Sequence, residues 1–94
     1  MNQYEIKPSS RFKKDLKRLK KRGYDLSLLA FPIDMLASGQ PLPPAYLDHP
    51  LKGSLKKYRE CHITPDWVLI YEIWEDQLIL YLMTTGTHDE TMGV

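Results

Sequence analysis

The chain has 94 residues, of which 27% are charged and 43% hydrophobic, and its formal net charge is only +1. A chain of this length buries about 60 to 65% of its unfolded surface, so we expect one small domain that spans residues 1–94. The single cysteine, Cys61, excludes an intramolecular disulfide. The N-terminus lacks the basic start and apolar stretch of a signal peptide, and no apolar run approaches the roughly 18 residues of a membrane span. These features predict a cytoplasmic protein.

The near-neutral total hides a strong charge polarity along the chain. All 13 Lys and Arg lie at or before Arg59, and nine of them fall between Lys7 and Arg22. From Glu60 onward the chain holds 7 acidic residues and no Lys or Arg. This asymmetry predicts a face that binds a polyanion such as RNA, and the alternative is an ordinary solvated helix face rich in lysine. In this basic segment the candidate RNA-binding residues are Lys13 and Lys17.

The first half of the chain predicts a strand followed by two helices. Residues 4–7 alternate apolar and polar side chains, which is typical of a short strand, and Pro8 ends it. Ser9 or Ser10 can cap a helix that runs to about residue 22, because apolar residues recur there at helical spacing. Asp25 can cap a second helix that runs to about residue 38. Pro32 lies inside that helix and predicts a kink or a break there.

The second half predicts strands. Residues 40–45 are too rich in proline for a helix or a central strand and indicate an extended connector. Residues 57–63, 67–73 and 77–85 are rich in aromatic and β-branched side chains and are separated by short turns, which predicts an antiparallel meander. The expected fold is therefore an α+β domain of order β-α-α-β-β-β, in which a helical hairpin packs on one face of a small twisted antiparallel sheet.

Each of the three histidines lies near other groups that transfer protons or bind phosphate. His49 precedes Lys52, His62 follows Arg59, and His88 follows the last predicted strand. Histidine is the side chain whose ordinary pKa lies near neutrality, so a cluster of three suits acid–base chemistry. Taken singly, His62 is equally well explained as a hydrogen-bonded sheet residue, and His49 as a loop residue without a task. The spacing of the histidines matches no zinc-ligand pattern, so we assign no metal and no cofactor.

Four segments, taken in order, resemble the YafQ-like branch of the RelE/ParE toxin superfamily. They are Asp48-His49-Pro50-Leu51-Lys52-Gly53, Tyr58-Arg59-Glu60-Cys61-His62, Pro65-Asp66-Trp67-Val68-Leu69-Ile70-Tyr71 and Thr85-Gly86-Thr87-His88. The resemblance covers almost the whole chain, including the basic first helix and the proline-rich connector. It implies a RelE-like fold and a toxin of a type II toxin–antitoxin pair, an mRNA interferase that cleaves messenger RNA in the ribosomal A site without a metal.

The resemblance also implies roles for individual residues. The implied catalytic group consists of His49, His62, Asp66 and His88. Arg59 falls where related toxins place a basic residue on the scissile phosphate. The family usually carries an aromatic residue four positions after the last histidine, and here Met92 holds that place and can still pack against a base. The remaining candidates for RNA contact are Lys52, Lys56 and Lys57.

Cleavage of RNA without a metal needs a base for the 2′-hydroxyl, an acid for the departing 5′-oxygen and positive charge on the transition state. The candidates for the two proton transfers are His88 together with Asp66 or His62, and the sequence leaves the choice of acid and base open. Arg59 is the candidate for phosphate stabilisation. Arg59 and His62 have opposite parity on an ideal strand, so both face one site only if the strand bulges or ends near Cys61.

The implied partners are a cognate antitoxin of the RelB/DinJ type, whose C-terminal segment wraps the toxin, and the ribosome with its mRNA; no membrane is involved. Two other functions remain open. One is a non-enzymatic inhibitor of the ParE type, which shares the fold but binds DNA gyrase, and the other is a degenerate module that docks on an antitoxin or on rRNA without cutting. The presence of His62, Asp66 and His88 favours cleavage, because a gyrase inhibitor of this fold needs no such set.

Overall fold

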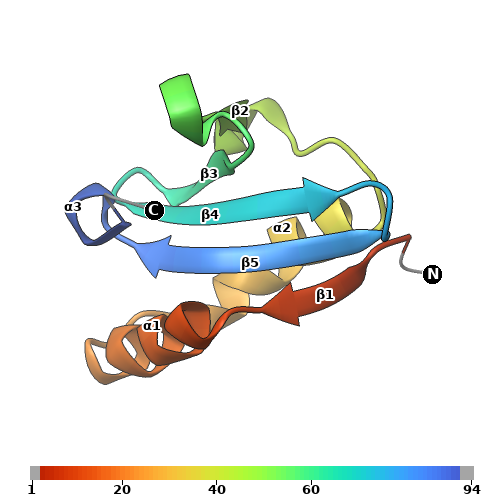
Figure 1. Cartoon of the computed structure of the whole chain (residues 1–94). Helices are drawn as coiled ribbons and strands as arrows, with labels where there is room; N and C mark the ends of the chain where they lie inside the picture. The colour runs from red at the N-terminus through yellow and green to blue at the C-terminus, as the bar shows by residue number, and fades with distance from the viewer. Residues whose placement is uncertain (1–2, 92–94) are drawn as a thin grey trace.

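The computed structural model describes residues 3–91. Its helices and strands follow the chain as shown in Figure 1: β1 (Glu5–Pro8), α1 (Ser10–Lys21), α2 (Ala30–Ala37), β2 (His49–Pro50), β3 (Arg59–Thr64), β4 (Trp67–Trp74), β5 (Ile79–Gly86) and α3 (His88–Thr91). Short 3-10 helices occupy Leu26–Leu29, Pro44–Tyr46 and Gly53–Leu55. The predicted α+β order is confirmed, and β3, β4 and β5 begin and end no more than two residues from their expected positions.

The sheet is mixed, with strand order β1-β5-β4-β3-β2. The expected antiparallel meander of β3, β4 and β5 is present, but β1 pairs with β5 in the parallel direction. The expectation of a wholly antiparallel sheet was therefore wrong for β1. A parallel pair needs a long crossover, and here the helices and the other strands separate β1 from β5 in the chain. Nothing in four alternating residues encodes that direction.

Local signals set the ends of α1 as the sequence predicts. The Ser9 side chain accepts a hydrogen bond of 2.9 Å from the Phe12 N–H, so Ser9 is the N-cap. The helix ends at Lys21, and Gly23 adopts a left-handed φ of +86° that a glycine tolerates without strain. Phe12 and Leu19 are buried and place the apolar stripe of the helix on the core.

The second helix is broken, as predicted, but the break precedes the proline. The Asp25 side chain accepts a hydrogen bond from the Ser27 N–H and caps the 3-10 helix Leu26–Leu29. The α-helix begins only at Ala30, so Pro32 lies in its first turn. A proline is tolerated there because the first N–H groups of a helix have no partner within the helix.

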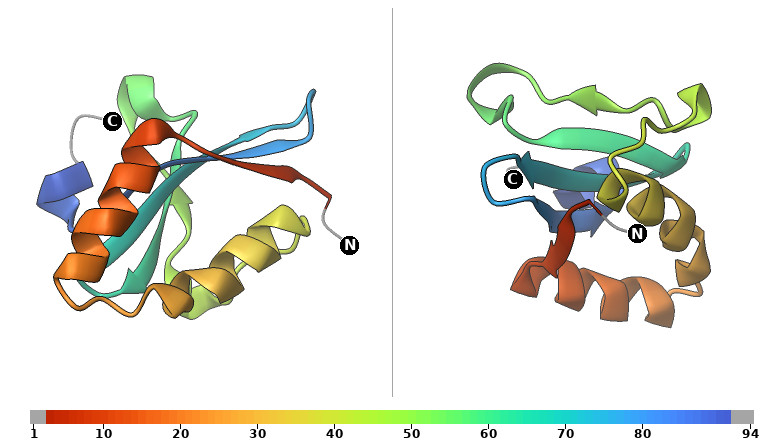
Figure 2. Two further views of the ribbon diagram at one scale, coloured as in Figure 1. Left: turned by 90° about the horizontal axis from the view of Figure 1, so that it is seen from below. Right: turned by 90° about the vertical axis from the view of Figure 1, so that its right-hand side faces the viewer.

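Both helices pack on the same face of the sheet, as the two views of Figure 2 show. The core between them joins buried side chains of the helical layer to those of β3, β4 and β5: Phe12, Leu19, Leu29, Leu36, Ala37, Cys61, Leu69, Tyr71, Leu80 and Leu82. Side chains alternate along a strand, so the residues of β3 next to Cys61, which are Glu60 and His62, point to the other face. Within residues 3–91, no helix has the length and apolar character needed to cross a membrane.

Candidate active site

A buried carboxylate lies among the three histidines. Glu60 Oε1 lies 3.4 Å from Nε2 of His49 and 3.5 Å from Nε2 of His62. The same oxygen lies 3.3 Å from Nε2 of His88. Glu60 is only 7% exposed, whereas the His88 side chain is 54% exposed. One carboxylate oxygen thus lies within 3.5 Å of three imidazoles that come from three different elements, and we call these four residues the Glu60 cluster.

Strand pairing assembles the Glu60 cluster. β2 pairs with β3 so that His49 lies opposite Glu60. Glu60 and His62 are two residues apart on β3 and therefore share a face. β4 separates β3 from β5, and the chain leaves the end of β5 to begin α3 at His88, whose ring centre lies 5.3 Å from that of His62. The segment that follows the predicted connector of residues 40–45 therefore contributes a short strand, β2, which the sequence did not predict.

The backbone before β2 orients His49. Leu47 adopts a left-handed conformation with φ 49° and ψ 40°, and its carbonyl oxygen lies 2.6 Å from Nδ1 of His49. A carbonyl oxygen can only accept, so Nδ1 carries the donating proton in this arrangement. The Nε2 atom that faces Glu60 then holds a proton only in the imidazolium form. In that form His49 can donate to the Leu47 carbonyl and to Glu60 at the same time.

Two surface hollows border the cluster. Asp66, in the turn between β3 and β4, shares a hollow of about 480 Å³ with His88; its lining residues are Tyr24, Asp66, Thr87, His88 and Asp89. The second hollow, of about 290 Å³, is mostly apolar and lies beside His62; its lining residues are Ala45, Leu47, His62, Ile63, Thr64 and Pro65. The structure therefore brings Asp66 to the side of the cluster that His88 occupies. The apolar hollow has room for a nucleobase next to His62.

Arg59 lies on the opposite face of β3 from the cluster. Its Nε donates a hydrogen bond of 3.2 Å to Asp48 Oδ1, and the Tyr71 hydroxyl donates one of 2.6 Å to the same oxygen. Burial, followed by the hydrogen bond to Asp48, raises the pKa of Tyr71. The register of β3 and β4 shifts only between His62 and Thr64, so no bulge reverses the parity of Arg59 and His62. The structure therefore does not bring Arg59 to the histidines.

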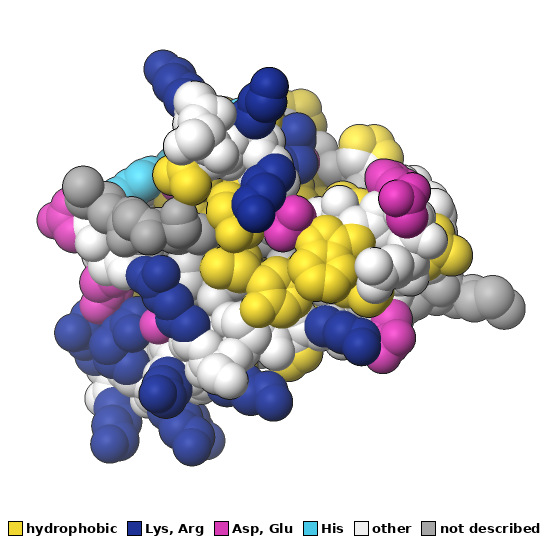
Figure 3. Space-filling model, viewed as in Figure 1, with side chains coloured by type: hydrophobic (Ala, Val, Ile, Leu, Met, Phe, Trp, Pro, Cys, Tyr) yellow, Lys and Arg dark blue, Asp and Glu magenta, His cyan; other side chains and the backbone are white. Residues whose placement is uncertain are grey.

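The predicted lysines all lie on the surface. Lys13 and Lys17 are exposed on α1, where Lys and Arg side chains crowd together in Figure 3. The exposed lysines near the 3-10 helix Gly53–Leu55, which follows β2 and precedes β3, are Lys52, Lys56 and Lys57. Met92 lies outside the described residues. Basic side chains therefore lie on α1 and in the segment between β2 and β3, the two strands at one edge of the sheet.

Glu60 is a candidate site residue that the sequence did not indicate. It lies inside the segment Tyr58-Arg59-Glu60-Cys61-His62, of which only Arg59 and His62 were predicted site residues. The available signal was strand parity, because Glu60 and His62 are two residues apart on a predicted strand and share a face. The carboxylate could have been assigned to the histidine side of that strand from this alternation alone.

The cluster also contains a set of atoms that could hold a metal ion. Glu60, His62 and His88 place one ligand atom each within 4.8 Å of one another. Imidazole nitrogens and a carboxylate oxygen are suitable ligands for zinc or copper. The spacing of the histidines along the chain did not indicate this set, because the fold brings its ligands together from β3 and α3.

The fold and the cluster define a small α+β protein with acid–base groups at one edge of its sheet and a strongly basic helix. Residues 4–93 match the family described as "Bacterial toxin of type II toxin-antitoxin system, YafQ". The mRNA interferase toxin YafQ of Escherichia coli (strain K12) is 40% identical over 94 residues, which is 99% of this chain and 100% of that protein. The chain belongs to the YafQ family of bacterial toxins from type II toxin–antitoxin systems, as its four segments predicted.

Solved structures agree with this membership. The crystal structure of a metal-bound toxin from Helicobacter pylori is 48% identical, with a TM-score of 0.89 over 95% of this chain and 99% of that chain. The toxin in the crystal structure of the Escherichia coli DinJ–YafQ complex is 40% identical, with a TM-score of 0.87 over 97% of this chain and 99% of that chain. The RelE-like fold implied by the resemblance is therefore confirmed.

Proposed function

We propose that this toxin is an endoribonuclease, an mRNA interferase that cleaves messenger RNA in the ribosomal A site. The observation that carries the proposal is the convergence of three imidazoles on Glu60 Oε1 at an exposed sheet edge. A gyrase inhibitor or a passive docking module has no need of such a cluster. The full-length relative from Escherichia coli, which is 40% identical, is named an mRNA interferase.

The cluster supplies the groups that cleavage requires. One imidazole takes the proton of the 2′-hydroxyl, which attacks the neighbouring phosphorus, and a second group protonates the departing 5′-oxygen. His88 has the most exposed side chain of the three histidines, and its partner is His62 or Asp66, which borders the same hollow as His88. The upstream product then ends in a 2′,3′-cyclic phosphate, and the reaction needs no metal ion.

Glu60 acts in this scheme on the histidines and not on the RNA. An imidazole that accepts a proton becomes a cation, and a fixed carboxylate 3.3 to 3.5 Å away stabilises that cation at the moment it forms. The carboxylate is buried before the substrate arrives, so no reorganisation of water is needed there. Glu60 is therefore a positioning and charge-stabilising residue for His49, His62 and His88.

The surface lysines supply phosphate contacts that do not depend on base identity. These contacts come from Lys13, Lys17, Lys52, Lys56 and Lys57. Arg59 remains our candidate for contact with the scissile phosphate. Its side chain is paired with Asp48 on the opposite face of β3, so this role requires it to break the ion pair and move toward the histidines. Met92 remains the candidate for contact with a base.

The proposal includes partners and location. The Escherichia coli YafQ was solved in complex with DinJ, and we propose an antitoxin of that type for this chain, with a C-terminal segment that wraps the toxin. Masking of the basic helix α1 by such a segment would block binding to the ribosome electrostatically. We place the whole activity in one domain of residues 1–94 that acts in the cytoplasm.

Induction of the protein in cells without an antitoxin tests the proposal. Messenger RNA 5′-ends are mapped after induction of the wild type, of His88→Ala and of Gln77→Ala, which changes an exposed turn residue between β4 and β5. In-frame cleavage by the wild type and Gln77→Ala, and none by His88→Ala, is expected. Growth arrest by all three proteins without cleavage would instead indicate a binding inhibitor, and gyrase would be assayed next.

Metal binding is a second candidate function of the same atoms. The observation in its favour is the set Glu60, His62 and His88, whose ligand atoms lie within 4.8 Å, together with the relative described as a metal-bound toxin. A bound Zn²⁺ or Cu²⁺ would occupy the nitrogens that otherwise move protons, so we expect these ions to inhibit cleavage. A titration of metal-stripped toxin with Zn²⁺ in a magnesium buffer distinguishes an inhibitory metal from a metal that cleavage requires. Loss of cleavage on addition of Zn²⁺ is expected, and activation would show that cleavage requires the metal.

A further inference from the structure

The end of the chain that carries His88 is fixed by a reciprocal hydrogen-bond pair. The segment Thr87-His88-Asp89-Glu90 opens α3. The Thr87 N–H donates a hydrogen bond of 2.9 Å to Glu90 Oε1, and the Glu90 N–H donates one of 3.2 Å to Thr87 Oγ1. This arrangement is a capping box, in which the cap residue and the third residue of the helix satisfy each other. It fixes the backbone on both sides of His88.

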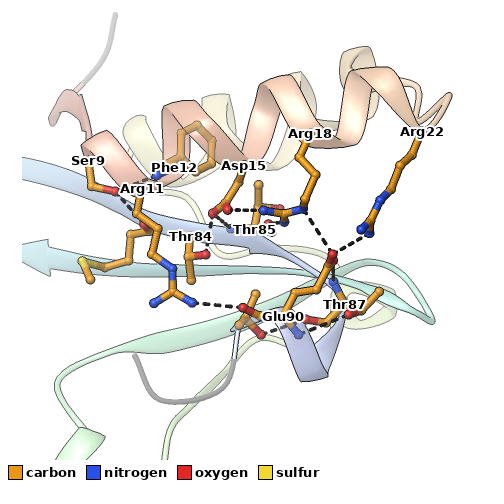
Figure 4. A network of polar contacts seen from close by, with 12 residues as sticks. Ser9, Arg11, Phe12, Asp15, Arg18, Arg22, Thr84, Thr85, Thr87 and Glu90 are labelled. Carbon is orange, nitrogen blue, oxygen red and sulfur yellow. Dashed lines mark hydrogen bonds and ion pairs between the residues drawn. The ribbon is translucent and has the colours of Figure 1, made fainter.

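The second carboxylate oxygen of Glu90 joins this turn to the basic helix α1, as Figure 4 shows. Glu90 Oε2 lies 2.5 Å from Nη1 of Arg22 and 3.1 Å from Nε of Arg18. The Arg11 side chain also donates a hydrogen bond of 3.0 Å to the Glu90 carbonyl oxygen. The Thr87 N–H, followed by the arginines, holds the pKa of Glu90 below its usual value. We call Arg18, Arg22 and Glu90 the α1–α3 clamp.

The clamp is anchored to the sheet through a buried aspartate. Asp15 is 4% exposed and accepts a hydrogen bond of 2.7 Å from Arg18 Nη1. Its other oxygen accepts from the Thr84 hydroxyl at 2.5 Å and from the Thr85 N–H at 3.1 Å. The Arg18 guanidinium also donates to the Thr85 carbonyl at 3.2 Å. These contacts with β5 fix Arg18 independently of its ion pair with Glu90.

A glycine leaves room for the clamp. A Cβ atom at Gly86 would lie 2.7 Å from Glu90 Oε1 and 2.9 Å from Arg18 Nη2, both too close for real contacts. Gly86 also adopts a φ of +152°, which L-residues rarely take. The last residue of β5 therefore allows α1 and α3 to approach each other.

We propose that Glu90, held by Arg18 and Arg22, is a positioning residue for His88 in the proposed cleavage reaction. The His88 side chain is 54% exposed, so apart from its contact with Glu60 its position depends on its backbone. That backbone belongs to a helix of only 4 residues, which is not stable by itself. The inference rests on the proposed function, since it assigns a task to residues outside the Glu60 cluster.

The proposal divides the basic helix into two sets with different kinetic effects. Arg18 and Arg22 form ion pairs with Glu90 within the protein, so their loss should lower kcat. Exposed lysines of the same helix, such as Lys20, can contact only the polyanion, so their loss raises KM. Charge alone does not separate the two sets, because each side chain carries one positive charge.

A double-variant cycle on ribosome-dependent cleavage tests this division. Glu90→Ala and Arg22→Ala should each lower kcat about ten- to hundredfold, because a small displacement of a reacting group has effects of that order. The double variant should be no slower than the slower single variant, since both remove one interaction. Lys20→Ala, the matched control, should change KM and not kcat. Losses that multiply in the double variant, or a pure KM effect of Arg22→Ala, would overturn the proposal.

A second measurement does not depend on any cleavage. Backbone ¹⁵N relaxation of residues 87–90 should show greater mobility in Glu90→Ala than in the wild type, with no change in Lys20→Ala. Glu90→Gln keeps an oxygen for the Thr87 N–H but loses the charge that attracts the arginines, and it should give intermediate mobility. Unchanged relaxation in Glu90→Ala would refute the positioning role. If residues 87–90 are rigid in the wild type but the wild type cleaves no mRNA, the proposed function is refuted while the effect of Glu90 on the backbone stands.

Discussion

The replacement Asp15→Ala tests how α1 is held on the sheet. Asp15 accepts hydrogen bonds from Arg18, from the Thr84 hydroxyl and from the Thr85 N–H, and it is 4% exposed. Alanine removes the acceptor of two buried donors and of Nη1 of Arg18, whose guanidinium keeps its contacts with Thr85 and Glu90. The free energy of unfolding should fall, because water cannot reach the two threonine groups to replace the lost acceptor.

The magnitude follows from these groups. A buried donor without a partner costs about 1 to 3 kcal/mol, and breaking a buried ion pair costs about 3 to 5 kcal/mol. The Arg18 side chain is 33% exposed, so water partly replaces its lost partner and the lower value applies. A loss of about 3 kcal/mol corresponds to a fall in Tm of at least about 12 °C for a chain of this size.

Thermal and urea unfolding, followed by circular dichroism, measure the effect. Asp25→Ala is the matched control, because Asp25 is an exposed cap whose carboxylate accepts from the Ser27 N–H, and its loss should cost about 1 kcal/mol. A destabilisation by Asp15→Ala that is no larger than that of Asp25→Ala would refute the assignment of Asp15 as the anchor of α1.

Three other predictions follow from single residues. Burial raises the pKa of the Cys61 thiol to about 12, so the folded protein should not react with a thiol reagent at pH 8, and rapid reaction without unfolding would contradict this burial. The folded-state pKa of Glu90 is lowered from 4.5, so its ionised form stabilises the fold above that pH. The difference in unfolding free energy between wild type and Glu90→Gln should therefore be constant above about pH 5 and shrink as the pH falls through the lowered pKa; a difference that grows in acid would reverse the sign of this contribution. Glu60→Gln keeps the size of the side chain but removes its charge, so single-turnover cleavage should slow about 10²-fold with the fold intact by circular dichroism, and full activity would show that the charge plays no part.

The elements that depend on neighbouring residues were predictable from the sequence. Ser9 and the apolar stripe of α1 identified that helix, and the aromatic and β-branched runs identified β3, β4 and β5. Caps and alternation act over a few residues, so the printed sequence contains the whole of each signal.

Features that depend on distant residues were harder to predict. The parallel direction of β1 is set by its pairing with β5 across the rest of the chain. The second helix breaks before Ala30, two residues ahead of Pro32, and locating this break required knowledge of where the preceding 3-10 helix ends. The resemblance supplied the overall arrangement but not these details.

The site divides in the same way. Residue type and family pattern indicated the histidines, and β2–β3 pairing with the end of β5 brings all three to Glu60. Parity raised a conflict between Arg59 and His62, and the regular register of β3 resolves it by placing them on opposite faces. The capping box at Thr87 and Glu90 has a sequence signature, a Thr followed three residues later by Glu, and could have been read directly.

Cleavage of a defined mRNA on purified ribosomes is the measurement that tests the proposed function most directly. Wild-type protein should cut the mRNA only when ribosomes are present, leave a 2′,3′-cyclic phosphate on the upstream product, and remain active after metal is stripped from the toxin. His88→Ala should slow this cleavage about 10² to 10⁴-fold, as expected for the loss of a general acid or base. Equal cleavage by His88→Ala, or growth arrest by the wild type without any cleavage, would contradict an acid–base ribonuclease built around Glu60.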